Sequence, residues 1–144
     1  MGFGLPAAMG ALLGRPGKQV VAVVGDGGFQ MTNQEIITAV QYNIPLKVVI
    51  MNNGYLGMVR QWQEMFYDRA YSEVDLSVSP DFVKLAEAYG ALGLRAQKPG
   101  ELAAVLEEGL AHKGVTIMDI VVSKEENVFP IVPAGGNARD MILK

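Results

Sequence analysis

The sequence has 144 residues, a formal net charge of −3 and no cysteine. This length suits one domain with a hydrophobic core and is short for two. Half of the residues are hydrophobic and 19% are charged, which indicates a globular chain rather than a disordered one. The acidic balance excludes the basic stripe of a nucleic-acid binder, and the lack of cysteine excludes disulfides and thiolate metal sites.

The longest apolar runs, 20–24 and 48–51, are far shorter than the roughly 20 residues that a membrane-spanning helix requires. No basic segment followed by an apolar one opens the chain, so no secretory signal is indicated. These features predict a cytoplasmic protein that binds neither membrane nor nucleic acid.

The first half of the chain alternates between helical and extended patterns. Residues 6–13 are rich in alanine and leucine and predict a buried helix. The β-branched run 19–24 is polar on neither face, which predicts a strand covered on both sides, as in a parallel sheet. Thr32 and Glu35 have the spacing of a capping box and predict a helix that runs to about Tyr42. Residues 46–51 predict a second strand.

The second half continues the alternation. Ser79, followed by Pro80 and Asp81, is suited to begin a helix that ends at Gly90. The other expected elements are a helix over 56–65, an irregular stretch over 67–77, a short strand over 93–96, a helix over 99–112, a strand over 115–122 and an irregular tail from 125. This order predicts a single domain over residues 1–144, with a three-layer α/β/α fold and a largely parallel sheet.

Two strand ends carry the candidate chemistry. One predicted strand ends in Gly25-Asp26-Gly27-Gly28 and the next ends in Asn52-Asn53-Gly54. Ligands of open α/β sheets bind at the carboxyl ends of strands, so neighbouring strands would bring Asp26 and Asn53 face to face. Their oxygens suit Mg²⁺, and the glycines allow a phosphate to approach the backbone. Either motif alone is typical of an ordinary turn, but the pair is more specific.

The spacing of the two motifs resembles a known signature. Gly25-Asp26-Gly27, 24 further residues and then Asn52-Asn53 are similar to the motif of thiamine-diphosphate decarboxylases and carboligases. The resemblance implies that Asp26, Asn53 and the backbone carbonyl of Tyr55 bind Mg²⁺, which bridges to the cofactor diphosphate. It also implies that Gly25, Gly27, Gly28 and Asn53 contact the cofactor.

Three longer strings, 1–8, 55–64 and 79–90, resemble the C-terminal domain of acetohydroxyacid (acetolactate) synthase large subunits. This implies that Met1, Gly57 and Met58 lie against thiamine diphosphate and that Trp62 shapes the pocket for the second 2-oxo acid. Without the resemblance, Trp62 would be read as a core or interface aromatic.

In that family, pyruvate is decarboxylated and the two-carbon unit is condensed with pyruvate or 2-oxobutyrate, in branched-chain amino-acid biosynthesis. The resemblance implies further parts outside this chain: a pyrimidine-binding domain with the activating glutamate, contributed by a second catalytic subunit, an FAD-binding domain, and a small regulatory subunit. We therefore expect no catalytic residue in these 144 residues. We expect the chain to belong to a longer enzyme and to form no acetolactate by itself.

Three alternatives share part of this pattern. Another thiamine-diphosphate carboligase or oxidase would share the metal motif, and a non-catalytic remnant would retain only cofactor binding. A dinucleotide-binding domain is disfavoured because residues 25–30 lack the third glycine of its fingerprint. The remaining polar candidates have plain structural interpretations. Arg60 and the pair Glu125-Glu126 are expected to be solvated, and His112 is expected to interact with a helix dipole.

Overall fold

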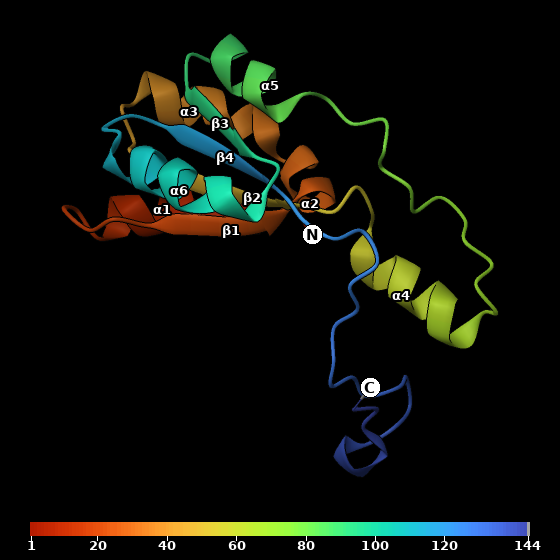
Figure 1. The fold of residues 1–144 in the computed structure, drawn as a ribbon. Coiled ribbons are helices and arrows are strands. Elements are labelled where there is room, and N and C mark those ends of the chain that lie inside the picture. The colour runs from red at the N-terminus through yellow and green to blue at the C-terminus, as the bar shows by residue number, and fades with distance from the viewer. Residues whose placement is uncertain (144) are drawn as a thin grey trace.

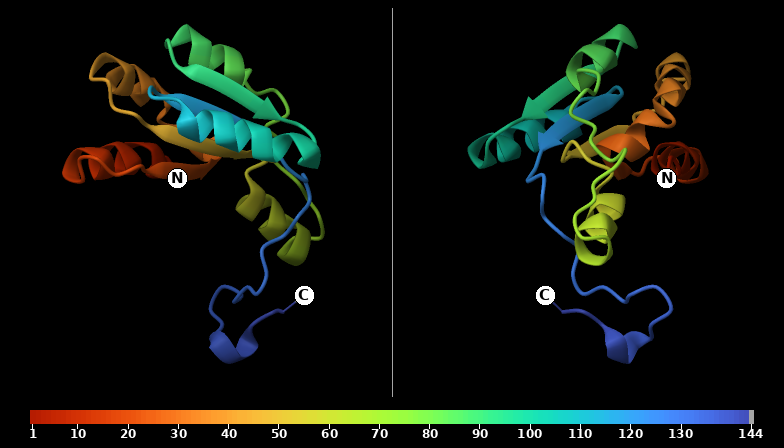
Figure 2. Two further views of the ribbon diagram at one scale, coloured as in Figure 1. Left: turned by 60° about the vertical axis from the view of Figure 1, so that its left-hand side comes forward. Right: turned by 90° about the vertical axis from the view of Figure 1, so that its right-hand side faces the viewer.

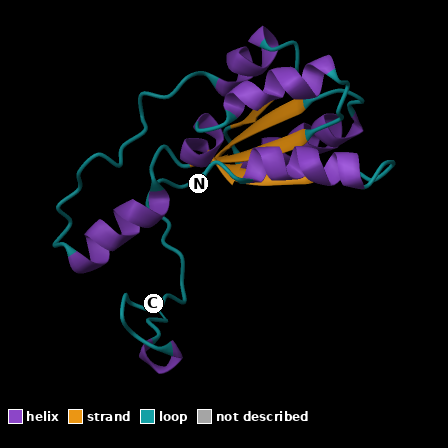
Figure 3. Ribbon diagram, turned by 180° about the vertical axis from the view of Figure 1, so that it is seen from behind, coloured by secondary structure: helices purple, strands orange, loops and turns teal. Residues whose placement is uncertain are grey.

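The computed structural model describes residues 1–143 and contains a four-stranded, fully parallel sheet in the order β1-β2-β4-β3 (Figure 1). Its strands are β1 (Val21–Gly25), β2 (Lys47–Asn52), β3 (Leu92–Ala96) and β4 (Thr116–Val121). Helices lie on both faces of the sheet (Figure 3). This arrangement confirms the predicted three-layer α/β/α fold.

One face of the sheet carries the larger core. It is covered by α1 (Gly4–Gly14), α3 (Ile36–Gln41) and α5 (Phe82–Ala88), with the short α2 (Asp26–Gln30) directly after β1. In α1, the side chains at positions 5, 8, 9 and 12 have the spacing of one helical face, and all four are buried against the sheet. A helix over 6–13 was predicted and is confirmed.

Within residues 1–143, the other face is covered by α6 (Leu102–Ala111) alone, which packs on β3 and β4 (Figure 2). Val21 and Val23 of β1 are therefore 40% and 65% exposed. The prediction that this strand is covered on both sides is wrong, because β1 is an edge strand and α6 does not reach over it. A continuous apolar run does not distinguish a central strand from an edge strand with one bare face.

Two predicted helix starts need correction. Thr32 lies at the predicted N-cap position, before a 3-10 turn over Asn33–Glu35 that leads into α3, but the predicted capping box does not form, because the Thr32 hydroxyl donates to the carbonyl of Gly2 at 3.0 Å. Asp81, not Ser79, is the N-cap of α5, because its carboxylate accepts from two backbone amides of the first turn. The Thr32 hydroxyl is engaged by a tertiary partner, and the Asp81 carboxylate is a stronger acceptor than the hydroxyl of Ser79, two residues earlier.

Helix α4 (Gly57–Phe66) lies beyond the carboxyl ends of the strands, next to the C-terminal segment (Figures 1 and 2). The side-chain amide of Gln61 exchanges two hydrogen bonds of 2.9 Å with the backbone of Val128. Arg60 pairs with Glu64 at 2.7 Å and also donates to Asn127 and to the backbone carbonyl of Glu125. Arg60 is only 3% exposed, so the expectation of a solvated side chain is wrong.

The amino ends of the strands enclose a lysine. Lys47 is 2% exposed, and its ammonium donates to the carbonyls of His112 and Gly114 at 2.5 and 2.6 Å and to the hydroxyl of Thr116 at 3.2 Å. Burial lowers the pKa of Lys47. This group ties the end of α6 to the start of β4. In the described part of the chain, no helix is long and apolar enough to cross a membrane.

Candidate functional site

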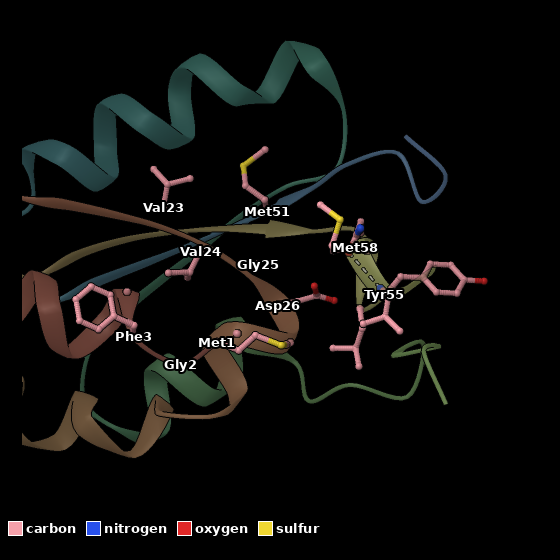
Figure 4. A pocket seen from close by; sticks show the side chains of 17 residues that line it. Met1, Gly2, Phe3, Val23, Val24, Gly25, Asp26, Met51, Tyr55 and Met58 are labelled. Carbon is pink, nitrogen blue, oxygen red and sulfur yellow. Dashed lines mark hydrogen bonds between the residues drawn. The ribbon is translucent and has the colours of Figure 1, made fainter. Parts of the chain in front are cut away.

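A cavity of about 520 Å³ opens at the carboxyl ends of β1 and β2 (Figure 4). Its walls come from the residues before and at the start of α1, the end of β1, the start of α2 and the first turn of α4. Nine of the predicted site residues line it: Met1, Gly25, Asp26, Gly27, Gly28, Asn53, Tyr55, Gly57 and Met58. The two motifs that the sequence separates by 24 residues are therefore brought to one place.

Strand pairing explains the meeting of Asp26 and Asn53. Gly25 of β1 lies in register with Met51 of β2, so the residues that follow leave the sheet side by side. The backbone N–H of Gly54 donates to Oδ2 of Asp26 at 3.0 Å, which joins the two loops directly. The expectation that these strands are neighbours is confirmed.

Asp26 is 1% exposed. Burial raises its pKa, hydrogen bonds from the backbone amides of Gly27 and Gly54 act in the opposite direction, and the negative charge of Asp119 raises it further. The hydrogen bonds offset only part of the cost of burying the carboxylate. A cation placed in the adjoining cavity would stabilise its charged form. The electrostatics of this residue therefore fit a metal ligand.

The remaining oxygen donors fit a hard cation as well. Within residues 1–143, no three His, Cys, Asp or Glu side chains gather into a metal site. A site at Asp26 would thus combine one carboxylate with the amide oxygen of Asn53, a backbone carbonyl and oxygens of the ligand, which is how Mg²⁺ is commonly held beside phosphates. Figure 4 shows the Tyr55 ring pointing away from Asp26, so this residue can contribute only its backbone.

The glycines of the site have two different roles. A Cβ atom at Gly25 or Gly28 would meet nothing within 4 Å, so both positions border open space. A Cβ at Gly27 would lie 2.7 Å from Leu56, and one at Gly57 would lie 2.9 Å from Nδ2 of Asn53. The first pair leaves room for a ligand beside the backbone, and the second pair allows the loop after β2 and the start of α4 to approach the site closely.

One wall of the cavity is apolar, and the sequence motifs predict only part of it. Phe3, Val23 and Met51 line the cavity together with Met1 and Met58 (Figure 4). Val23 and Met51 read as core in the sequence because each lies in a β-branched or apolar run. Only the edge position of β1 leaves them beside the cavity, which therefore suits a ligand with an anionic end and an apolar ring.

Trp62 lies one helical turn beyond Met58 on α4 and is not part of the cavity wall. Its ring packs edge-on against Phe66, with 5.9 Å between the centroids. Its role toward a second substrate stays a prediction.

Comparisons with known proteins agree with this geometry. The family model described as "Thiamine pyrophosphate enzyme, C-terminal TPP binding domain" matches residues 1–120. The chain is 47% identical to the acetolactate synthase large subunit of Lactococcus lactis subsp. lactis (strain IL1403) and 45% identical to the isozyme 3 large subunit of Escherichia coli (strain K12). Each match covers 99% of this chain and 24% or 25% of the relative, so the chain spans about a quarter of their length.

A solved structure gives the same assignment. The thiamine diphosphate-dependent 4-hydroxybenzoylformate decarboxylase of Rhodococcus jostii RHA1 superposes with a TM-score of 0.81 at 32% identity, over 88% of this chain and 24% of that one. Sequence, fold and the residues gathered at the cavity thus agree. The chain belongs to the thiamine pyrophosphate enzymes, as a C-terminal TPP-binding domain of that family.

Proposed function

We propose that this chain is the diphosphate- and Mg²⁺-binding part of an acetolactate synthase large subunit. The cavity in which Asp26 and Asn53 meet carries the proposal. The 45–48% identity to acetolactate synthases over nearly the whole chain supports this subfamily over other carboligases and oxidases. The intact metal motif gives less support to a non-catalytic remnant.

The residues divide the work of binding. Asp26, Asn53 and the carbonyl of Tyr55 would hold Mg²⁺, and Gly25, Gly27 and Gly28 would admit the diphosphate. Met1, Gly57 and Met58 would contact the cofactor ring system from the apolar side of the cavity. When bound, thiamine diphosphate supplies the electron sink that decarboxylation of a 2-oxo acid requires. The chain itself binds and orients the cofactor and excludes water from its ring, and Trp62 would face the second 2-oxo acid.

The rest of the enzyme is part of the same proposal. Relatives about four times as long, named as large subunits, support further domains and partner subunits. These would supply the activating glutamate from a second catalytic subunit, an FAD site and a regulatory subunit. The substrates would be pyruvate and 2-oxobutyrate. A cytoplasmic location, predicted from the cysteine-free sequence, belongs to this proposal too.

The test uses the native polypeptide that carries this chain, purified from its source and sized by immunoblot. With thiamine diphosphate, Mg²⁺ and FAD, we expect pyruvate alone to give acetolactate and added 2-oxobutyrate to give acetohydroxybutyrate. Release of an aldehyde without carbon–carbon bond formation would instead identify a decarboxylase, as the Rhodococcus relative is named. The pure 144-residue chain should form no acetolactate, and measurable formation would contradict the predicted need for further domains.

A further inference from the structure

A line of polar contacts crosses the carboxyl edge of the sheet, outside the cavity described above. It begins at the N-cap of α5, where Oδ1 of Asp81 accepts from Nη2 of Arg95 at 2.7 Å. Nε of Arg95 donates to Oδ2 of Asp119 at 2.8 Å, and Oδ1 of Asp119 accepts from Nδ2 of Asn52 at 2.9 Å. The line thus runs from α5 through β3 and β4 to the last residue of β2.

The line ends at Asn52, next to the proposed metal ligand Asn53. The carbonyl of Asn52 accepts from the backbone N–H of Val122 at 3.0 Å, so both its side chain and its main chain are held by β4 and the residue after it. The next residue along the chain is Asn53, and the N–H of Gly54 donates to Asp26. The direction in which the Asn53 side chain leaves the sheet is therefore fixed from the Asn52 side by Asp119.

The burial of Asp119 makes this contact specific. Asp119 is 0% exposed, yet its two oxygens have different partners, an arginine on one side and an amide on the other. A buried carboxylate without a cation would be strongly disfavoured, so Arg95 makes the position tenable and leaves the second oxygen free for Asn52. An asparagine at position 119 cannot reproduce both contacts, because its NH₂ group would face one of two donors.

We propose that Asp119 is a positioning residue for the Mg²⁺–diphosphate site: through Asn52 it sets the orientation of Asn53. Asp119 does not touch the cofactor in this arrangement. The inference deepens the proposed function and rests on it. Groups behind metal ligands commonly contribute about 10–100-fold in metal affinity by fixing ligand orientation.

The chain offers a matched control for the alternative, a purely structural role. Thr116 lies in the same strand β4, is also 0% exposed and also accepts a side-chain hydrogen bond, but at the opposite end of the sheet, from Lys47. Thr116→Val should lower the unfolding temperature without changing affinity for Mg²⁺. Asp119→Asn should instead change the affinity.

The experiment titrates Mg²⁺ by calorimetry into the native polypeptide in the presence of thiamine diphosphate. We expect Asp119→Asn to weaken Mg²⁺ binding by about 10–100-fold and to lower kcat at saturating cofactor much less. Asn52→Ala, which removes the last contact and leaves the Asp119–Arg95 pair intact, should weaken binding in the same direction and keeps the test open if Asp119→Asn does not fold. Unchanged Mg²⁺ affinity in the variants that fold would overturn the inference. No Mg²⁺-dependent binding by the wild-type protein would overturn the proposed function as well.

Discussion

At the amino ends of the strands the ammonium of Lys47 donates to three neutral acceptors, whereas at the carboxyl ends the carboxylate of Asp26 borders an open cavity. Both residues are almost fully buried. Burial raises the pKa of Asp26 and lowers the pKa of Lys47, so it favours the neutral form of each. Lys47 also lines a cavity, of about 380 Å³, but its ammonium is already held by three acceptors, two carbonyls and a hydroxyl. Asp26 accepts from backbone amides and borders a space that could hold a cation.

The difference separates a structural buried charge from one prepared for binding. The hydrogen bonds that Lys47 donates reach the residues between α6 and β4 and the first residue of β4, so the lysine acts on the fold. Asp26, the first residue of α2, lies between Gly25 and Gly28, which border open space, and the proposed role of the aspartate is therefore to bind a ligand. The two residues should therefore fail in opposite ways when they are replaced.

The largest effect is expected for Asp26→Asn, which keeps the side-chain shape and an oxygen for the Gly54 amide but removes the charge. Mg²⁺-dependent binding of thiamine diphosphate should fall by at least about 100-fold, beyond the range seen for groups behind the ligands. Stability without metal should not fall, because burial of the carboxylate is itself unfavourable. Calorimetric titration and denaturant unfolding measure the two effects on the same sample.

Glu126→Gln is the control for Asp26→Asn, because Glu126 is an exposed carboxylate outside the cavity. It should change neither quantity. If Asp26→Asn bound thiamine diphosphate and Mg²⁺ as tightly as the wild type, the proposal that Asp26 is a metal ligand would be wrong.

The opposite failure is expected for Lys47→Met. Methionine fills a similar volume but leaves the carbonyls of His112 and Gly114 without their donor. The free energy of unfolding should fall by about 1–3 kcal/mol, the range for buried groups that lose a hydrogen-bond partner. Cofactor affinity should stay at the wild-type value, since the change lies at the other end of the sheet.

Lys18→Met, at an exposed position, serves as the matched control for Lys47→Met and should leave stability unchanged. A loss of cofactor binding by Lys47→Met at temperatures where the variant is folded would contradict the inference that Lys47 acts only on the fold.

The sequence predicted the carboxyl end far better than the amino end. Asp26 and Asn53 stand out because each follows a β-branched run, and parallel strands bring such residues to one edge. The fold class followed from the same alternation of strands and helices, without knowledge of any contact.

The groups that the sequence did not predict depend on contacts between distant segments. Lys47 and Asp119 lie in strands, where a lone charge reads as a solvent-facing position. The partners of Lys47 are 65–69 residues away, and those of Asp119 are 24 and 67 residues away. Arg60 was expected in solvent because the segment that buries it begins 65 residues later. A local pattern shows which residue types are present but not which distant backbone groups will satisfy them.

The smallest effect expected is a pH dependence that distinguishes a buried charge held only by neutral groups from one in an ion pair. Burial lowers the pKa of Lys47 in the folded protein below its ordinary value of 10.5. Between these two pKa values the unfolded chain binds more protons than the folded one, so the free energy of unfolding contributed by Lys47 rises with pH. Below the folded pKa both states are protonated and this dependence disappears.

The stability difference between wild type and Lys47→Met should therefore be constant near neutral pH and should grow as pH rises toward 10.5, which urea unfolding of both proteins over a pH series can measure. A difference that shrinks over that range would mean that the ammonium gains more from its partners than it loses by burial. Lys47 would then differ from Asp26, whose charged form is disfavoured by burial.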